Sequence, residues 1–266
     1  MSINSSSFEI LTKINRENIW DQEPVFCFSS DIDWASEEVL EEYFNIIPFE
    51  EIKLTAFVTH ESEQISDLAS QKRIHRGIHP NFLKDSSHGN SFKEIAETCR
   101  KLAPESIGFR SHRLFDVTDI THMLANDYGY KYVSNLGTTM ANYIRPMLHE
   151  SRLIHYPIFF EDGSHLYNEL GTSIHPYIDY FTHPGIKVIS FHPMNMVLNT
   201  PYMGYMRELK DSLTREEFNN IDRTIISSKR NGKRGIRNTV EDIINLAIRN
   251  NYKIMSLDEL YHQTII

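Results

Sequence analysis

The sequence has 266 residues, of which 40% are hydrophobic and 24% charged, enough to form one large domain around a substantial core. Its formal net charge of −9 and the lack of a concentrated Lys/Arg stripe argue against nucleic acid as the main partner, because phosphate backbones bind clustered cations. The amino terminus lacks the basic start and apolar stretch of a leader, and no segment approaches the ~20 apolar residues of a membrane span, so we expect a cytoplasmic protein.

Short apolar runs with β-branched or aromatic residues predict about eight strands along the chain. In chain order they are "PVFCFSS" (24–30), "IKLTAFVTH" (52–60), "KRIHRGIH" (72–79), "SIGFRSH" (106–112), "YKYVSN" (130–135), "LIHYPIFFED" (153–162), "IKVISFHP" (186–193) and "YKIMSL" (252–257).

Several intervening segments have the apolar spacing of helices. One follows a Ser36 cap, another follows Ser91, where "SFKE" fits a capping box, and two more cover 116–129 and 238–251. Strands that alternate with helices and are continuously apolar are typical of parallel strands buried on both faces. This pattern predicts an α/β fold, either a (β/α) barrel or a doubly wound sheet, in a single domain over residues 1–266.

Residues 194–237 interrupt the alternation. The segment is too long for a simple connection and mixes aromatic, Met and charged residues, which is typical of an insertion that caps a site. Cys27 and Cys99 both lie among apolar residues, so we expect core thiols and no disulfide.

Ionisable residues collect where the predicted strands stop. They are Asp31, Asp33, His79, Arg110, His112, Glu161, Asp162 and His192. Any one of them alone is more often a solvated strand terminus than part of a site. In a barrel, however, the carboxyl ends of all parallel strands open on one face, where active sites are built. We therefore expect these residues to converge there.

Asp31 and Asp33 form an unusual pair. Residues i and i+2 of a strand point to the same side with Cα atoms roughly 6.6 Å apart. Carboxylates that close repel each other unless a metal ion or a residue such as Arg110 lies between them. Carboxylate and imidazole together are typical ligands of Zn²⁺ and related divalent ions.

The histidines that complete such a site come from "IHRGIHPNFLKDSSHG" (74–89), which contains His75, His79 and His88. On a strand, His75 and His79 would lie roughly 13 Å apart, too far to share one ion. We therefore prefer His79 with His88, delivered by the following loop, alongside Asp33. A turn at Gly77 would bring His75 close enough, so His75 remains the alternative second imidazole.

The set of motifs resembles the polysaccharide deacetylase family, also called NodB-homology or carbohydrate esterase family 4 proteins. The motifs are "SSDID" (29–33), "GIHPNF" to "SSHG" (77–89), "GFRSH" (108–112), "FFEDG" (159–163) and "VISFHP" (188–193), within a resemblance that spans roughly residues 25–262. "SSDIDWAS", "GIHPNFLKDSSHG" and "RSHRLFD" resemble, more narrowly, a branch encoded with bacterial surface-polysaccharide (O-antigen) biosynthesis enzymes.

The resemblance implies a distorted (β/α) barrel of about seven parallel strands with a cap-like insertion after the seventh-strand motif. It further implies that Asp31 is the general base, held by Arg110, that Asp33 is a metal ligand and that His192 is the general acid, oriented by Asp162 or Glu161. His112 and Glu161 are expected to contact substrate. The first motif departs from the family's adjacent Asp residues, and the third lacks the usual Pro and Gly after its Arg.

The expected function is metal-dependent hydrolysis of an N-acyl, in particular N-acetyl, group from an amino sugar that is nucleotide- or lipid-linked, with Zn²⁺ as the ion. The ion would polarise the acyl carbonyl, Asp31 would take a proton from water, and His192 would protonate the departing amine. Two alternatives are a metallohydrolase for another small amide and a catalytically degenerate homologue that binds carbohydrate.

Overall fold

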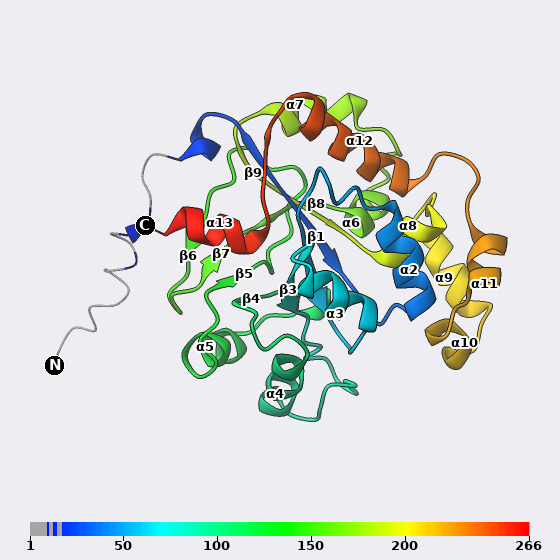
Figure 1. The fold of residues 1–266 in the computed structure, drawn as a ribbon, viewed down its shortest axis with the longest axis horizontal. Coiled ribbons are helices and arrows are strands. Elements are labelled where there is room, and N and C mark those ends of the chain that lie inside the picture. Colours follow the sequence, from blue (N-terminus) through cyan, green and yellow to red (C-terminus); the bar gives the residue numbers. More distant parts are fainter. Residues whose placement is uncertain (1–9, 11–12, 15–17, 266) are drawn as a thin grey trace.

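The computed structural model describes residue 10, residues 13–14 and residues 18–265. Residues 1–9, on which the expectation of a missing leader depends, lie outside this range. The described chain folds around one sheet whose strands lie at the centre of the molecule (Figure 1). The strands are β1 Pro24–Asp31, β2 Leu54–Val58, β3 Ile74–Ile78, β4 Gly108–Phe109, β5 Tyr132–Val133, β6 Met147–Leu148, β7 Ile154–His155, β8 Ile158–Glu161, β9 Gly185–Phe191 and β10 Lys253–Ile254.

The sheet is curled into a distorted half-barrel of mainly parallel strands, in the order β6-β7-β5-β4-β3-β2-β1-β9-β8, with β10 pairing β1 beside this path. Among the named strands of the described residues, the ladder between β6 and β7 alone is antiparallel. The fold class predicted from the sequence is confirmed, although the sheet has ten strands where about seven parallel ones were expected. All of these strands except β6 lie, to within one residue, in the eight predicted runs, with β7 and β8 sharing one run; β6, a two-residue strand, was not predicted because it is too short to leave a sequence signal.

The predicted strand "LIHYPIFFED" is wrong as a single element, because it divides into β7 and β8. Pro157 lies between them and has no N–H to donate to a ladder. β7 pairs β5 near one edge of the sheet, whereas β8 pairs β9 at the other. Because only two residues separate these strands in the chain, this short connection brings the two sides of the curled sheet close together.

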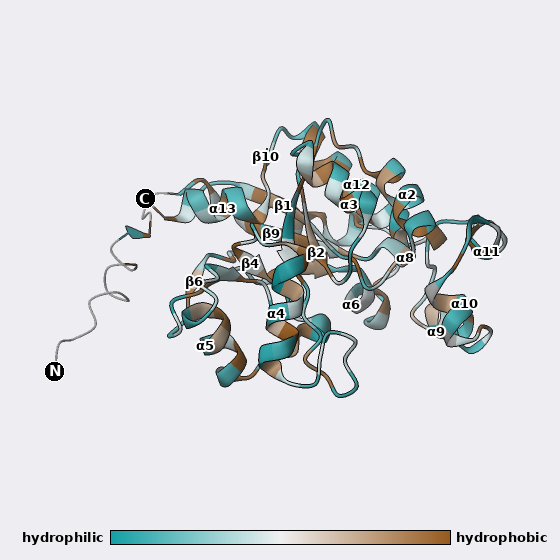
Figure 2. Ribbon diagram, turned by 60° about the horizontal axis from the view of Figure 1, so that its bottom comes forward, coloured by the Kyte–Doolittle hydropathy of each residue, from teal (hydrophilic) through white to brown (hydrophobic). Residues whose placement is uncertain are grey.

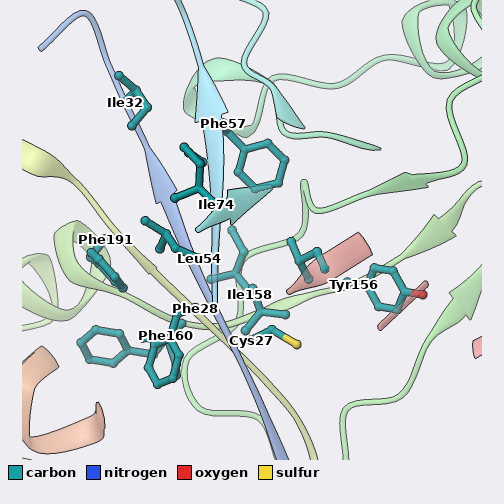
Figure 3. Close-up of a cluster of buried hydrophobic side chains, with 14 of the residues drawn as sticks. Cys27, Phe28, Ile32, Leu54, Phe57, Ile74, Tyr156, Ile158, Phe160 and Phe191 are labelled. Atoms are coloured by element: carbon teal, nitrogen blue, oxygen red, sulfur yellow. The ribbon is translucent and has the colours of Figure 1, made fainter. Parts of the chain in front are cut away.

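The core is built on both faces of the central strands. All eight residues of β1 and all seven of β9 are buried, as expected for parallel strands covered on both sides. Side chains from β1, β2, β3, β8 and β9 pack together in this cluster (Figure 3). Cys27 belongs to it, and both Cys27 and Cys99 are buried free thiols, which confirms that prediction.

Helices surround the sheet, and peripheral ones such as α4 and α5 carry both hydrophilic and hydrophobic residues (Figure 2). The α-helices are α2 Glu37–Ile46, α3 Glu63–Ser70, α4 Phe92–Leu102, α5 Thr118–Asn126, α6 Asp162–Tyr167, α7 Ile178–Thr182, α8 Pro193–Leu198, α9 Gly204–Asp211, α10 Arg215–Asn219, α11 Arg223–Lys229, α12 Ile236–Arg249 and α13 Leu257–Thr264. Short 3-10 helices are η1 Ile19–Asp21, η2 His112–Leu114 and η3 His175–Tyr177.

The predicted helix starts are present. The hydroxyls of Ser36 and Ser91 accept from the third helical N–H of α2 and α4. The capping box at Ser91 is only half formed, because the Glu94 carboxylate accepts instead from the N–H of Asn90. The 194–237 segment forms most of α8 together with α9, α10 and α11, which lie beside α2 at one end of the molecule (Figure 1). Among the described residues, none of the helices is both long and apolar enough to cross a membrane.

Candidate active site

The strand registers bring the predicted polar residues to one rim. Asp31 aligns with Phe57, Val58 with Ile78, and Ile78 with Phe109, so the residues that follow these strands lie side by side. On the other flank of β1, Ser30 aligns with Phe191, directly before His192. The carboxyl ends of the strands therefore gather the predicted residues at one place, as parallel pairing requires.

The Asp pair differs from a simple i, i+2 strand arrangement. β1 ends at Asp31, and both Asp33 and Trp34 adopt left-handed backbone conformations with φ of 47° and 55°. Such conformations are unfavourable for residues other than glycine. The Trp34 backbone is held in place by its N–H, which donates to the Thr59 hydroxyl over 3.0 Å. Because of this turn, the Asp33 side chain does not point as it would on a regular strand. Its carboxylate nevertheless faces the same two imidazoles as that of Asp31, those of His79 and His192.

Asp31 is held by a buried guanidinium. Nη1 of Arg110 donates to Oδ1 of Asp31 over 2.7 Å, and the Arg110 side chain is fully buried. The other guanidinium bonds go to buried oxygens of Ser29, Ser134 and Ser190. Burial alone would raise the pKa of Asp31, but Arg110, together with the imidazoles of His79 and His192, lowers it below the usual value. The free oxygen, Oδ2, lies 4.0 Å from Nε2 of both imidazoles.

Asp33, His79 and His112 form a compact donor group. Oδ1 of Asp33 lies 3.2 Å from Nε2 of His79 and 3.0 Å from Nδ1 of His112. One potential ligand atom from each residue lies within 4.8 Å of the others. Burial would raise the pKa of Asp33, but its hydrogen bonds with His112 and His79 hold that pKa well below the usual value. One carboxylate and two imidazoles, open to a cavity, fit a catalytic divalent-metal site.

The structure does not bring His88 into this group. Nε2–H of His88 donates to the carbonyl oxygen of Thr59 over 2.7 Å, and Nδ1 accepts from the N–H of Asn81 over 3.1 Å. Both ring nitrogens are therefore used in hydrogen bonds to the backbone, and the imidazole is neutral. Burial lowers the pKa of His88, which agrees with a neutral ring.

The alternative, His75, lies elsewhere. Its side chain is on β3, four residues before the strand-end position of His79, with Nδ1 3.4 Å from Oδ2 of Asp258 on α13. No turn forms at Gly77, which lies within β3 in register with Phe57. The third donor is instead His112, which the sequence indicated only as a substrate contact. His112 begins η2, which follows β4 after Arg110 and Ser111, and its N–H donates to the Pro80 carbonyl over 2.9 Å.

His192 and Asp162 form a second pair at the rim. Nδ1 of His192 lies 2.6 Å from Oδ1 of Asp162, whose Oδ2 accepts from the N–H of His192 and the amide of Asn195. Burial would lower the pKa of His192, but the Asp162 carboxylate raises it well above the usual value, assisted by Asp33 and Asp31. Nε2 of His192 lies 3.7 Å from Oδ2 of Asp33, so the ring faces the donor group.

Glu161 occupies a position different from Asp162. Its carboxylate caps α6 by accepting from the N–H and hydroxyl of Ser164, and its other oxygen lies 4.0 Å from Nδ1 of His192. Between the two acidic residues that sequence reasoning left open, Asp162 therefore makes the direct contact. Glu161, Asp162 and His192 form the second compact donor group among the described residues.

A cavity of about 740 Å³ opens over these residues. It is lined by Asp33, His112 and His192, by residues of the 80–88 loop and by residues of the α8–α10 region. Trp34 also lines it, with its ring centroid 5.2 Å from that of His112 and 5.4 Å from that of His88. Trp34 was not predicted as a site residue, although its position directly after Asp33 is a signal in the sequence that could have indicated it.

Comparison with known proteins gives a family match and several structural ones. A model of a polysaccharide deacetylase family described as WbmS-like matches residues 28–210. A crystal structure of WbmS from Bordetella bronchiseptica, assigned as a polysaccharide deacetylase involved in O-antigen biosynthesis, is 26% identical, with a TM-score of 0.71 over 83% of this chain and 89% of that one. No curated protein sequence matches the chain.

More distant structures also align. The peptidoglycan deacetylase PdaC from Bacillus subtilis is 10% identical, with a TM-score of 0.44 over 91% of this chain and 92% of that one. A family 4 acetyl xylan esterase from Clostridium thermocellum, solved with a cobalt ion, is 11% identical, with a TM-score of 0.41 over 90% of each chain.

Proposed function

This chain belongs to the WbmS-like family of polysaccharide deacetylases, and we propose that it is a metal-dependent deacylase that removes an N-acyl, in particular N-acetyl, group from an amino sugar used in bacterial surface-polysaccharide biosynthesis. One observation carries the proposal: Asp31 and His192, with pKa values shifted in opposite directions, flank the donor group of Asp33, His79 and His112. Groups with separated pKa values are the usual basis for assigning base and acid roles.

The metal ligands in this proposal are Asp33, His79 and His112, with Zn²⁺ as the ion that suits one carboxylate and two imidazoles. When bound, the ion supplies Lewis-acid polarisation of the acyl carbonyl and makes water a better nucleophile at neutral pH. His112 thus takes the place first given to His88, which is committed to the backbone.

Asp31 is the proposed base. Its low pKa keeps it ionised, and Oδ2, which is free of Arg110, points toward the imidazoles where the attacking water would lie. Arg110 holds Oδ1 and thereby fixes the orientation of the carboxylate. Asp31 takes one proton from the water as the water oxygen attacks the acyl carbon.

His192 is the proposed acid. Asp162 keeps Nδ1 occupied and the ring protonated, so Nε2–H is directed into the cavity. There it can donate its proton to the amide nitrogen as the C–N bond breaks, releasing a carboxylic acid and a free amino sugar. Trp34, on the cavity wall, offers an aromatic face to the sugar ring.

The test is acetate release from a panel of N-acetylated amino sugars by metal-loaded protein. Wild type should release acetate, and His192→Ala should lower kcat by about 10²–10⁴-fold, the usual worth of a general acid. His183→Ala is the matched control, because His183 is exposed and lies outside the cavity. No release from any compound, or equal loss in the two variants, would contradict the proposal.

A further inference from the structure

The cavity is larger than one amino sugar requires. At about 740 Å³ it lies in the upper part of the range of about 300–1,000 Å³ that holds drug-sized ligands. Asp33, His112 and His192 line only part of it, so an acylated sugar placed beside them for reaction leaves much of the cavity unfilled. The unfilled part extends toward the helices of the 194–237 segment.

The wall of this part of the cavity is apolar except for one lysine side chain, Lys210. Met203, Met206, Lys210 and Leu213 recur at helical spacing on and beside α9, and Phe218 of α10 completes the wall. Sugar hydroxyls require hydrogen-bonding partners, which Met, Leu and Phe do not provide. The wall therefore suits an apolar group joined to the sugar.

Lys210 is an exposed lysine at the cavity wall. Its Nζ lies 4.9 Å from the centroid of the Phe218 ring, and it forms no ion pair with any carboxylate of the described residues. Glu208, on the same helix, accepts instead from the Tyr202 hydroxyl. Among the described side chains that line the cavity, Lys210 is the sole lysine or arginine, whereas Asp33 and Asp85 are acidic.

We propose, on the basis of the proposed function, that the substrate is an acylated amino sugar linked through a phosphate or diphosphate to an apolar or aromatic group. Lys210 binds the phosphate, for which an ammonium is a common partner, and the apolar wall packs against the group beyond it. Exposed Tyr202 and Met203, 48% and 52% accessible, continue the apolar surface to the cavity rim, where a longer chain would leave.

The experiment compares N-acetylglucosamine with its uridine diphosphate and farnesyl diphosphate esters, using metal-loaded full-length protein. Wild type should have a KM for one diphosphate ester at least 10-fold below that for the free sugar. Lys210→Met should raise that KM by about 10- to 100-fold, the worth of a charge-assisted hydrogen bond. Lys101→Met, on the exposed end of α4, is the charge-matched control and should leave KM unchanged.

Comparison of the uridine and farnesyl diphosphate esters shows whether the phosphate belongs to a nucleotide or to a lipid. Calorimetry with farnesyl diphosphate and uridine diphosphate on His192→Ala protein measures binding without turnover. Acetate release with equal kcat/KM for free sugar and both esters would overturn the phosphate inference and leave the proposed function standing. Lys210-dependent binding of the diphosphates without acetate release from any compound would overturn the proposed function and leave only the phosphate-binding role of Lys210 standing. Neither binding nor release would overturn both.

Discussion

The Asp162→Asn substitution tests whether the carboxylate beside His192 sets the protonation of the proposed acid. Asp162 is fully buried and accepts from the His192 ring over 2.6 Å, the His192 N–H over 2.8 Å, the Asn195 amide over 3.0 Å and the Gly163 N–H over 2.7 Å. Asparagine keeps one acceptor oxygen and replaces the other with an NH₂ group, which cannot accept from these donors.

Loss of the charge removes the main cause of the raised pKa of His192, so that pKa must fall. A hydrogen bond to a charged group is worth about 1.5–3 kcal/mol, which corresponds to roughly a 10- to 150-fold loss of kcat at neutral pH. Because a general acid must be protonated, the alkaline limb of the pH–rate profile should also move to lower pH.

The assay is kcat/KM for acetate release as a function of pH, with metal-loaded wild type, Asp162→Asn and Glu161→Gln. Glu161→Gln is the matched control, because the amide oxygen can still accept from Ser164 at the start of α6 and the contact of 4.0 Å with His192 is long. An alkaline limb that stays in place in Asp162→Asn, or that moves equally in Glu161→Gln, would refute the reasoning.

Three further predictions follow from buried polar groups. Lys187→Met should stabilise the protein at pH 7 by up to about 3 kcal/mol in urea unfolding, because burial lowers the pKa of Lys187 from 10.5 to about 8 with no hydrogen-bond partner for Nζ among the described residues. Between pH 8 and 10.5 the unfolded wild-type chain binds more protons than the folded one, so the free energy of unfolding should rise with pH in this range. In Lys187→Met this rise should be lost. A rise as large as that of wild type would show that Lys187 is not the group that titrates. His88→Ala should destabilise by about 2–4 kcal/mol in urea, because the buried Thr59 carbonyl and the half-buried Asn81 N–H lose their partners, and a loss under 1 kcal/mol would argue against this role. Asp31→Asn should retain the metal, measured by elemental analysis, while kcat for acetate release falls by about 10²–10⁴-fold; loss of the ion would instead make Asp31 a ligand.

The convergence of strand-end residues could be predicted because parallel pairing brings carboxyl ends together whatever the loops do. Asp31, Arg110 and His192 each lie at or directly after a strand, so their places depend on register alone. The sequence also predicted the central strands well, since β1 and β9 are long and continuously apolar.

The histidine assignment could not be obtained in the same way. His112 reaches Asp33 from an irregular segment after β4, where its N–H donates to the Pro80 carbonyl over 2.9 Å, and such a tertiary contact leaves no pattern in the sequence. The His88 ring is held by hydrogen bonds to the backbone of Asn81, within the same loop, and of Thr59, which lies outside the motif. Spacing alone could not distinguish a ligand from a structural imidazole.

Metal stoichiometry tests the central claim most directly. Metal-free protein is dialysed against Zn²⁺, and the bound ion is counted for wild type, Asp33→Ala, His112→Ala and His88→Ala, with folding checked by circular dichroism. The account predicts one tightly bound ion per chain in wild type and in His88→Ala, and loss of that ion in Asp33→Ala and His112→Ala. Retention of the ion in folded His112→Ala, with its loss in folded His88→Ala, would contradict it.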